Sequence, residues 1–264
     1  MSRFCPLFSS SKGNSLFLSG GSTSLLVDAG VSARRLFQAM NARGFQPENL
    51  AGILITHEHS DHIAGLETLL KKIKIPVYAA AETLEWLCGA GKIPPGTTLV
   101  ECATGQGFTV GDIAVTAFDT PHDAVHSLGF RFVMPDQRKI GIATDLGHIT
   151  GTVEHHLTGC DLILLESNYD KSMLEVSPYP YVLKRRIKGE RGHLSNDDCS
   201  AELARLVKSG STYFILGHLS EQNNMPEIAS QTTRLRLAAD SLRERLDYIL
   251  QVAPAREPGE VLTF

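Results

Sequence analysis

One stretch of ten residues constrains the fold and the chemistry of this chain more than any other part. Residues 53–62 read Ile-Leu-Ile-Thr-His-Glu-His-Ser-Asp-His, an apolar run followed by four groups that can bind a metal ion. The apolar, β-branched start predicts a buried strand, so the four groups follow at its carboxyl end. His57 and His59 are two positions apart and therefore face the same way on an extended segment. Asp61 and His62 lie where the next helix begins, so the segment can supply a second metal ion from its other end.

The alternative interpretation of this stretch is a set of hydrogen-bonded, partly exposed histidines. Four ionisable side chains crowded against a buried strand are costly unless a charged group holds them together, and this cost favours a metal site. Imidazole suits zinc, iron and manganese, and a carboxylate adds oxygen-ligand character. The ligand types therefore predict a divalent metal without selecting one.

The composition of the chain bounds the class of protein. At 264 residues it has the length of one large domain or two small ones, and a net charge of −4 excludes a strongly basic protein. Contact with nucleic acid would then need a local patch of positive charge. The five cysteines are scattered and never at C-x-x-C spacing, which favours free thiols in a reducing compartment. Without a signal-peptide core or an apolar run of about 18 residues, we expect a cytoplasmic protein that does not bind a membrane.

Two parts of the chain share one order of features, which predicts two similar α/β halves. Residues 25–30 read Leu-Leu-Val-Asp-Ala-Gly, and residues 141–147 read Gly-Ile-Ala-Thr-Asp-Leu-Gly. In each, an apolar strand ends in aspartate, a helix follows, and the next strand ends in an ionisable residue, His57 or Glu166. Two sheets packed face to face with helices outside fit this pattern. Sites in helix-covered sheets form beyond the carboxyl ends of strands.

Apolar periodicity and turn residues predict the remaining elements. The expected helices span residues 33–43, 63–73, 81–87, 152–157, 180–188, 196–209 and 225–245. The expected strands span residues 15–19, 22–28, 52–56, 75–79, 98–102, 108–110, 113–118, 128–134, 139–144, 161–166, 212–216 and 248–252. Before the first strand, small polar residues predict either a loop that wraps an anion with its backbone N–H groups or an ordinary polar turn, at residues 9–15.

Three further residues at expected strand ends can complete a metal site. A histidine in a loop, such as His122, is more often a surface residue, but a lone His-x-His pair leaves a catalytic zinc short of its three protein ligands. Asp145 can bridge two cations, because a carboxylate has two oxygens, and it can also cap a helix. His218 directly follows an apolar run, residues 214–217.

The pattern His-x-His-x-Asp-His, followed by a later His, Asp and His, resembles the metallo-β-lactamase superfamily over nearly the whole chain. The resemblance implies one α/β domain over residues 1–264, a four-layer αββα metallo-β-lactamase sandwich. It also implies two divalent metal ions, zinc or manganese, with iron as a further candidate. Carried over position by position, the ligands of one ion would be His57, His59 and His122. Those of the other would be Asp61, His62 and His218, with Asp145 as a bridge and Asp28 as a supporting residue.

The C-terminal third narrows the resemblance. Residues 192–195 read Gly-His-Leu-Ser and residues 216–220 read Leu-Gly-His-Leu-Ser. This pair of motifs resembles the end of ribonuclease Z and related phosphodiesterases. The whole set of motifs is similar to small stand-alone bacterial nucleases of the YycJ (WalJ) type, a group described as DNA exonucleases that work from the 5′ end. The chain departs from ribonuclease J, since no β-CASP insertion is visible, and the lack of a long flexible arm argues against tRNA processing.

The resemblance implies hydrolysis of a nucleic acid, DNA in the first place, by a hydroxide whose parent water has its pKa lowered by two metal ions. Asp61 would orient or deprotonate that water. His193 would contact the scissile phosphate or protonate the leaving oxygen, or else be only a neighbour of the helix-capping Ser195. Further residues expected at the phosphate are Ser11, Asn14, Ser195 and Asn196. A run of cations would hold the nucleic-acid backbone or form a solvated face: Lys184, Arg185, Arg186, Lys188 and Arg191.

Three other functions remain open from the sequence. A thioesterase of the glyoxalase II kind shares the first motif but usually carries Gly-His-Thr-x-Gly-His later, where residues 121–126 read Pro-His-Asp-Ala-Val-His. A small cyclic phosphodiester would need the same metal chemistry as a nucleic acid. A metal-binding sensor without turnover would not need an open site for two ions. The sequence makes no prediction of the oligomeric state.

Overall fold

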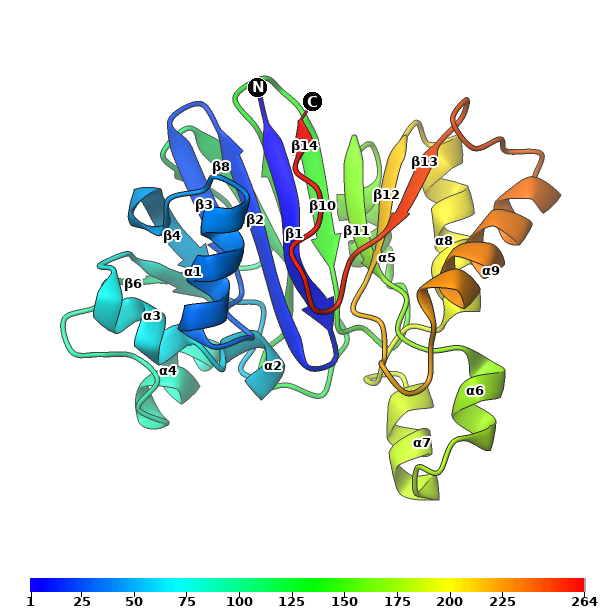
Figure 1. Cartoon of the computed structure of the whole chain (residues 1–264), viewed down its shortest axis with the longest axis horizontal. Helices are drawn as coiled ribbons and strands as arrows, with labels where there is room; N and C mark the ends of the chain where they lie inside the picture. Colours follow the sequence, from blue (N-terminus) through cyan, green and yellow to red (C-terminus); the bar gives the residue numbers. More distant parts are fainter. Residues whose placement is uncertain (264) are drawn as a thin grey trace.

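The structure, a computed structural model, describes residues 1–263. Within that range the chain forms two seven-stranded sheets that face each other, with helices against their outer faces (Figure 1). This is the four-layer αββα sandwich that the resemblance implied. In the same range, no helix combines the length and the apolar character needed to cross a lipid bilayer.

The first sheet contains the N-terminal strands, paired in the order β14-β1-β2-β3-β4-β5-β6. Its strands are β1 (Arg3–Ser10), β2 (Gly13–Gly20), β3 (Thr23–Val27), β4 (Leu50–Leu54), β5 (Val77–Ala79), β6 (Leu99–Glu101) and β14 (Leu262–Thr263). Strands β1 to β3 pair antiparallel, and β3 to β6 pair parallel. The carboxyl ends of β3 and β4 therefore reach the same edge of the sheet.

The second sheet repeats this plan in the order β13-β12-β11-β10-β9-β8-β7. Its strands are β7 (Gly107–Val110), β8 (Ile113–Asp119), β9 (Leu128–Val133), β10 (Lys139–Ala143), β11 (Leu162–Glu166), β12 (Tyr213–Gly217) and β13 (Ile249–Val252). Strands β7 to β10 pair antiparallel, and β10 to β13 pair parallel. Strand β10 therefore corresponds to β3, as the repeated sequence pattern predicted.

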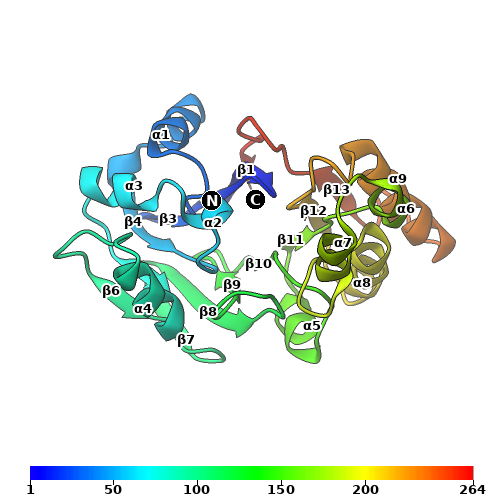
Figure 2. The same cartoon turned by 90° about the horizontal axis from the view of Figure 1, so that it is seen from below.

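Most helices lie on the outer faces of the two sheets, as the view from below shows (Figure 2), whereas two short helices extend beyond the lower edge of the second sheet (Figure 1). Those beside the first sheet are α1 (Ala33–Ala42), α2 (Ser60–Ile63), α3 (Leu66–Lys72) and α4 (Ala81–Gly89), with a 3-10 turn at Pro47–Asn49. Those beside the second are α5 (Gly151–Leu157), α6 (Lys171–Val176), α7 (Tyr181–Lys188), α8 (Asn196–Lys208) and α9 (Pro226–Ala239).

Alternation along β3 shows why the sheets are covered on both faces. Leu25 and Val27 belong to the core between the two sheets, whereas Leu26 belongs to the core beneath the outer helices. Successive side chains of a strand point to opposite faces, so a strand that is apolar at every position is buried on both sides.

The structure corrects the expected N-terminal region. Residues 9–15, expected as a loop, instead contribute the end of β1, a tight turn and the start of β2. The sequence did not predict β1, because its register shifts between Pro6 and Phe8 and the shift hides the alternation. Phe4 and Leu7 on this strand are fully buried, which explains its place in the sheet.

One expected helix is interrupted and another ends earlier than predicted. The helix at 63–73 is broken into α2 and α3 at Gly65, where an added Cβ would lie 2.1 Å from the carbonyl oxygen of Val31. The helix at 225–245 ends as α9 at Ala239, and positive φ values of 62° at Ser241 and 67° at Arg245 stop its continuation. Helix α6 was not predicted, because a short amphipathic turn has too few residues to show a period.

Candidate metal centre

The structure brings the seven candidate metal ligands together at the carboxyl ends of the parallel strands. Their donor atoms form overlapping groups within which all atoms lie within 4.8 Å of one another. These groups are His57 with His59 and His122, His57 with His62 and Asp145, and Asp61 with His62 and His218. Two of the groups match the two ligand sets that the resemblance implied, and the third joins them.

Left-handed backbone at strand ends helps to form the cluster. The φ angle is 61° at Asp28 after β3, 57° at Asp145 after β10 and 54° at His218 after β12. This conformation is uncommon for residues other than glycine and costs free energy that the surrounding structure must offset. It recurs at the equivalent ends of β3 and β10, so the repeated sequence pattern has a common backbone geometry.

Hydrogen bonds in the first sheet determine which imidazole nitrogens face the cluster. Asp28 Oδ2 accepts hydrogen bonds from His62 Nδ1 at 2.8 Å and from Thr56 Oγ1 at 2.9 Å. Since the single hydroxyl hydrogen of Thr56 goes to Asp28, His57 Nδ1 donates to Thr56 Oγ1 at 3.0 Å. His57 Nε2 then has no hydrogen, and His62 Nε2 lies 3.1 Å from Asp145 Oδ2 inside the cluster.

The second sheet orients its histidines in the same way. His122 Nδ1 donates to the carbonyl oxygen of Gly192 at 3.0 Å, and His218 Nδ1 donates to Glu166 Oε1 at 2.7 Å. The Nε2 atom of His122 lies 3.3 Å from His59 Nδ1, and that of His218 lies 3.4 Å from the nearer oxygen of the aspartate at position 61. Metal-binding histidines are held in this manner, with the second nitrogen on an oxygen acceptor.

The centre of the cluster contains donors that fit a cation. Among the described residues, buried His57 Nε2 has no hydrogen-bond partner, and Asp145 Oδ2 has none of acceptable geometry. Burial, assisted by the charge of His62, holds the pKa of His57 well below its ordinary value, so its ring is neutral. Burial opposes ionisation of Asp145, but the charges of His218 and His62 keep the pKa of this carboxyl well below its usual range. A neutral imidazole nitrogen and a buried carboxylate oxygen are donors that divalent metals bind.

Glu166 is a fully buried acid at the end of β11 that ties the cluster to its surroundings. Its Oε1 accepts hydrogen bonds from His218 Nδ1 at 2.7 Å and His193 Nδ1 at 2.9 Å. Its Oε2 accepts from the backbone N–H groups of Leu146 at 3.0 Å and Leu194 at 3.1 Å. Burial opposes its charge, yet the neighbouring His193 and His218 lower the pKa of Glu166. The sequence indicated Glu166 only as a strand end, and that position was the available signal.

Asp61, the expected base, lies at the open side of the cluster with 21% of its side chain exposed. Burial opposes its charge, but His62 lowers the pKa of Asp61 far below its ordinary value, so it is a carboxylate at neutral pH. Asn14 Nδ2 lies 3.3 Å from Asp61 Oδ2 and 3.1 Å from His62 Nε2. Asn14, expected at the phosphate, therefore contacts candidate ligands directly.

The other residues expected at the phosphate divide into two groups. His193 is 16% exposed and its Nε2 has no hydrogen-bond partner among residues 1–263, and Ser11 is exposed in the β1–β2 turn, so both can meet a substrate. Ser195 and Asn196 are buried and engaged within the protein, which gives their predicted role at the phosphate no support. Ser195 is fully buried and caps α8 by accepting from the backbone N–H of Asp198, and buried Asn196 bonds Ser167 Oγ at 2.7 Å.

The run of cations before His193 is largely engaged within the protein. Arg186 pairs with Asp123 at 2.9 Å, Arg191 Nε donates to the carbonyl oxygen of His122 at 2.8 Å, and Lys188 pairs with Glu175. The first two of these contacts fix the loop that contains His122. Three of the five cations in the run thus have partners within the protein, and binding of a polyanion by the run stays a prediction.

Comparison with known proteins agrees with this geometry. The profile of the Beta-lactamase superfamily domain matches residues 23–218. The exodeoxyribonuclease YycJ of Bacillus anthracis is 36% identical over 229 residues, which are 86% of this chain and 85% of the relative. The exodeoxyribonuclease WalJ of Streptococcus pneumoniae is 34% identical over 249 residues, which are 93% of this chain and 92% of the relative.

A solved structure gives the same fold. The metallo-β-lactamase fold protein YhfI from Bacillus subtilis matches with a TM-score of 0.75 at 17% identity, over 100% of both chains. That identity supports the fold alone. The fold and its clusters of histidine and aspartate suggest binding of divalent metal. From the profile match, the relatives and the architecture together, this chain belongs to the metallo-β-lactamase superfamily.

Proposed function

We propose that this chain is a metal-dependent nuclease that hydrolyses phosphodiester bonds, and that it degrades DNA from the 5′ end toward the 3′ end. The observation on which the proposal depends is Glu166, whose single oxygen Oε1 joins His218 to His193. Metal binding alone does not need a second histidine, His193, held beside the ligands. Hydrolysis of a phosphodiester does have a use for it, because His193 can donate to a phosphoryl oxygen or to the leaving oxygen. The relatives of 36% and 34% identity, both named exodeoxyribonucleases, support a DNA substrate.

The proposed centre binds two divalent ions, zinc or manganese with iron as a further candidate. His57, His59 and His122 would hold one ion, and Asp61, His62 and His218 would hold the other. Asp145 would serve both, because its Oδ2 lies 3.1 Å from His62 Nε2 and its Oδ1 lies 3.5 Å from His122 Nε2. One carboxylate oxygen thus faces each ligand group.

When bound, such ions supply hydroxide at neutral pH and offset the charge that develops on the phosphoryl oxygens. Asp61, a carboxylate at neutral pH, accepts a hydrogen bond from the attacking water and orients it. Glu166 accepts a hydrogen bond from Nδ1–H of His193, so Nε2 of this ring is the atom left to face the substrate. With a hydrogen on each nitrogen, as the imidazolium, His193 then donates from Nε2 to a phosphoryl oxygen, or gives that proton to the leaving oxygen and becomes neutral.

The thioesterase alternative finds no support in the 121–126 region. His126, the second histidine of this segment, is directed away from the cluster and contacts Glu82 Oε2 at 2.9 Å and Asp119 Oδ1 at 2.8 Å. A small phosphodiester as substrate uses the same residues, so it is tested together with nucleic acid.

The test compares end-labelled single-stranded DNA, duplex DNA and RNA, each with a 5′-phosphate or a 5′-hydroxyl, in the presence of Mn²⁺ or Zn²⁺. We expect stepwise loss of nucleotides from the 5′ end of DNA. His59→Ala should abolish the reaction and reduce bound metal, whereas His155→Ala, an exposed histidine on α5, should not. Hydrolysis of a thioester or a cyclic phosphodiester without any cleavage of DNA or RNA would contradict the proposal.

A further inference from the structure

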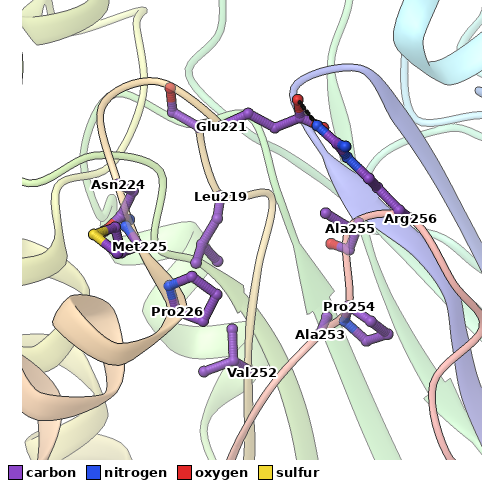
Figure 3. Close-up of a pocket in the computed structure, with 12 residues that line it drawn as sticks. Leu219, Glu221, Asn224, Met225, Pro226, Val252, Ala253, Pro254, Ala255 and Arg256 are labelled. Carbon is purple, nitrogen blue, oxygen red and sulfur yellow. Dashed lines mark hydrogen bonds and ion pairs between the residues drawn. The ribbon is translucent and has the colours of Figure 1, made fainter.

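A hollow lies beside the cluster, between the loop 219–226 and the segment 252–256 (Figure 3). Its volume is about 410 Å³, within the range of small-molecule sites. Leu219 in its wall directly follows the candidate ligand His218. Ser9, also in the wall, accepts a hydrogen bond from the backbone N–H of His218 at 2.8 Å. The hollow is therefore lined by one residue that follows this candidate ligand and by another that bonds its backbone.

The wall of this hollow is mainly apolar. The apolar residues that line it are Leu219, Met225, Pro226, Val252, Ala253, Pro254 and Ala255. Its polar side chains are those of Ser9, Ser220, Glu221, Asn224 and Arg256. Of these, Asn224 is already satisfied, because Nδ2 donates to the carbonyl oxygens of Ser167 at 2.9 Å and Asn168 at 3.1 Å. Met225 is 49% exposed at the rim. A flat, weakly polar ring such as a nucleobase fits this chemistry better than a charged group does.

A group of cations lies at the edge of the hollow. Glu221 reaches across from its loop to Arg256 (Figure 3), with Oε2 at 3.0 Å from Arg256 Nη2 and 2.8 Å from Lys12 Nζ. Beyond this contact is a second hollow of about 260 Å³, lined by Lys12, Arg35 and Arg256 among others. Arg35 Nη2 donates to the carbonyl oxygen of Arg256 at 3.2 Å, and its guanidinium lies over the Phe8 ring.

The three cations Lys12, Arg35 and Arg256 outnumber the one carboxylate that lies among them, Glu221. This local excess of positive charge contrasts with the net charge of −4 of the whole chain. Lys12 and Arg256 have 66% and 76% of their side chains exposed. An ammonium group has three N–H donors and a guanidinium has five, so most of their donors are free for an anion. Phosphate is the anion that such a group of exposed lysine and arginine side chains binds.

From this juxtaposition we infer a nucleotide subsite next to the metal centre, with a base in the apolar hollow and its phosphate on Lys12, Arg35 and Arg256. The inference rests on the proposed nuclease function and specifies its substrate. A base can enter the hollow only when it is unpaired, so the strand is held as single-stranded nucleic acid. Glu221 keeps the two loops together and leaves the outer donors of the cations to the phosphate.

The test measures binding of a fluorescein-labelled, phosphorothioate single-stranded oligonucleotide to the metal-loaded protein over a range of salt concentrations. Arg256→Ala should weaken binding roughly tenfold and reduce the slope of log affinity against log salt by about one. Arg138→Ala is the matched control, since Arg138 is an exposed arginine in a single ion pair with Asp161. It lies just before β10, at the end of that strand opposite to Asp145. Equal effects of the two variants would overturn the subsite.

The base pocket is tested with an oligonucleotide that carries an abasic residue near its 5′ end. Loss of the base should weaken binding by about tenfold in the unaltered protein, because the apolar surface that the base buries in the hollow is lost. Ala255→Phe, at a partly exposed position that lines both hollows, should remove this difference. If the abasic and intact strands bind equally to the unaltered protein, no base occupies the hollow.

Hydrolysis of bis-p-nitrophenyl phosphate, measured on the same samples, reports on the metal centre alone. Oligonucleotide binding that Arg256→Ala does not weaken would overturn the subsite and leave the nuclease proposal standing. A protein that hydrolyses the small diester but binds no oligonucleotide would overturn the subsite together with the nucleic-acid part of the proposed function.

Discussion

The two sheets supply the metal centre in different ways. The first sheet contributes His57, His59, Asp61 and His62 from one stretch, so a single loop after β4 fixes their relative positions. The second contributes His122, Asp145 and His218 from three separate strand ends, so the pairing of β8 to β12 fixes theirs. The first group is a local feature of the chain, whereas the second exists only after the sheet has formed.

The carboxylates that support the ligands, Asp28 and Glu166, also differ in whether their partners are close together in the sequence. Asp28 bonds Thr56 and His62, two residues of the single stretch. Glu166 bonds side chains or backbone from three different segments, including His193 and His218. A change in the second sheet should therefore disturb more of the site than an equivalent change in the first.

The largest expected effect is that of Asp145→Asn, which removes the charge facing both ligand groups. Loss of one preorganised electrostatic group in a buried site lowers rates by about 10²–10³-fold, so we expect phosphodiester hydrolysis to fall by roughly 10³-fold. Bound metal should fall as well. Elemental analysis and initial rates on the same samples measure both, and a variant with full metal content and full rate would show that Asp145 does not bridge.

The two supporting carboxylates offer a direct comparison. Glu166→Gln and Asp28→Asn should each lower metal affinity by about 10–100-fold, the usual effect of a residue that orients a ligand. At saturating metal, Asp28→Asn should recover its kcat, because the residues that Asp28 holds, Thr56 and His62, orient ligands and not His193. Glu166→Gln should remain slow, because His193 is no longer held in place. Equal recovery of the two variants would contradict the role of Glu166 in positioning His193.

The same contrast explains how much of the site the sequence predicts. Residues 53–62 are contiguous, so their ligand pattern is visible without knowledge of the fold. Asp145 and His218 were predicted from their places at strand ends and from the resemblance, and the structure brings both into the cluster. Glu166 looked no different from any acid at a strand end, because its role depends on rings that lie 27 and 52 positions away.

The remaining differences have physical causes of the same kind. Ser195 and Asn196 were expected at the phosphate from their neighbourhood to His193, but sequence proximity does not show which side chains are buried beneath a helix end. Strand β14 pairs with β1 across almost the whole length of the chain, so no local pattern predicts it. The helix capped by Ser195 was predicted from a local capping signal. The two halves were predicted from the repeated sequence pattern, and the four-layer sandwich from the resemblance.

The smallest expected effects come from two glycines that occupy equivalent positions after Asp28 and Asp145. A Cβ at Gly30 would lie 1.7 Å from the carbonyl oxygen of Asp61, and one at Gly147 would lie 2.3 Å from the backbone of Glu190. Gly30→Ala must displace the stretch that contains the ligands, and overpacking of this kind costs about 1–3 kcal/mol. We expect a lower free energy of unfolding and less bound metal.

Gly147→Ala instead presses on the chain after α7, which leads to His193 and not directly to a ligand. We expect it to retain its metal and to lose activity on phosphodiesters through displacement of His193. Urea unfolding, elemental analysis and kcat, measured together for the two variants, separate these outcomes. If Gly147→Ala lost as much metal as Gly30→Ala, the ligands of the second sheet would depend on the 189–193 segment as closely as those of the first depend on the loop after β4, and the difference between the sheets would not hold.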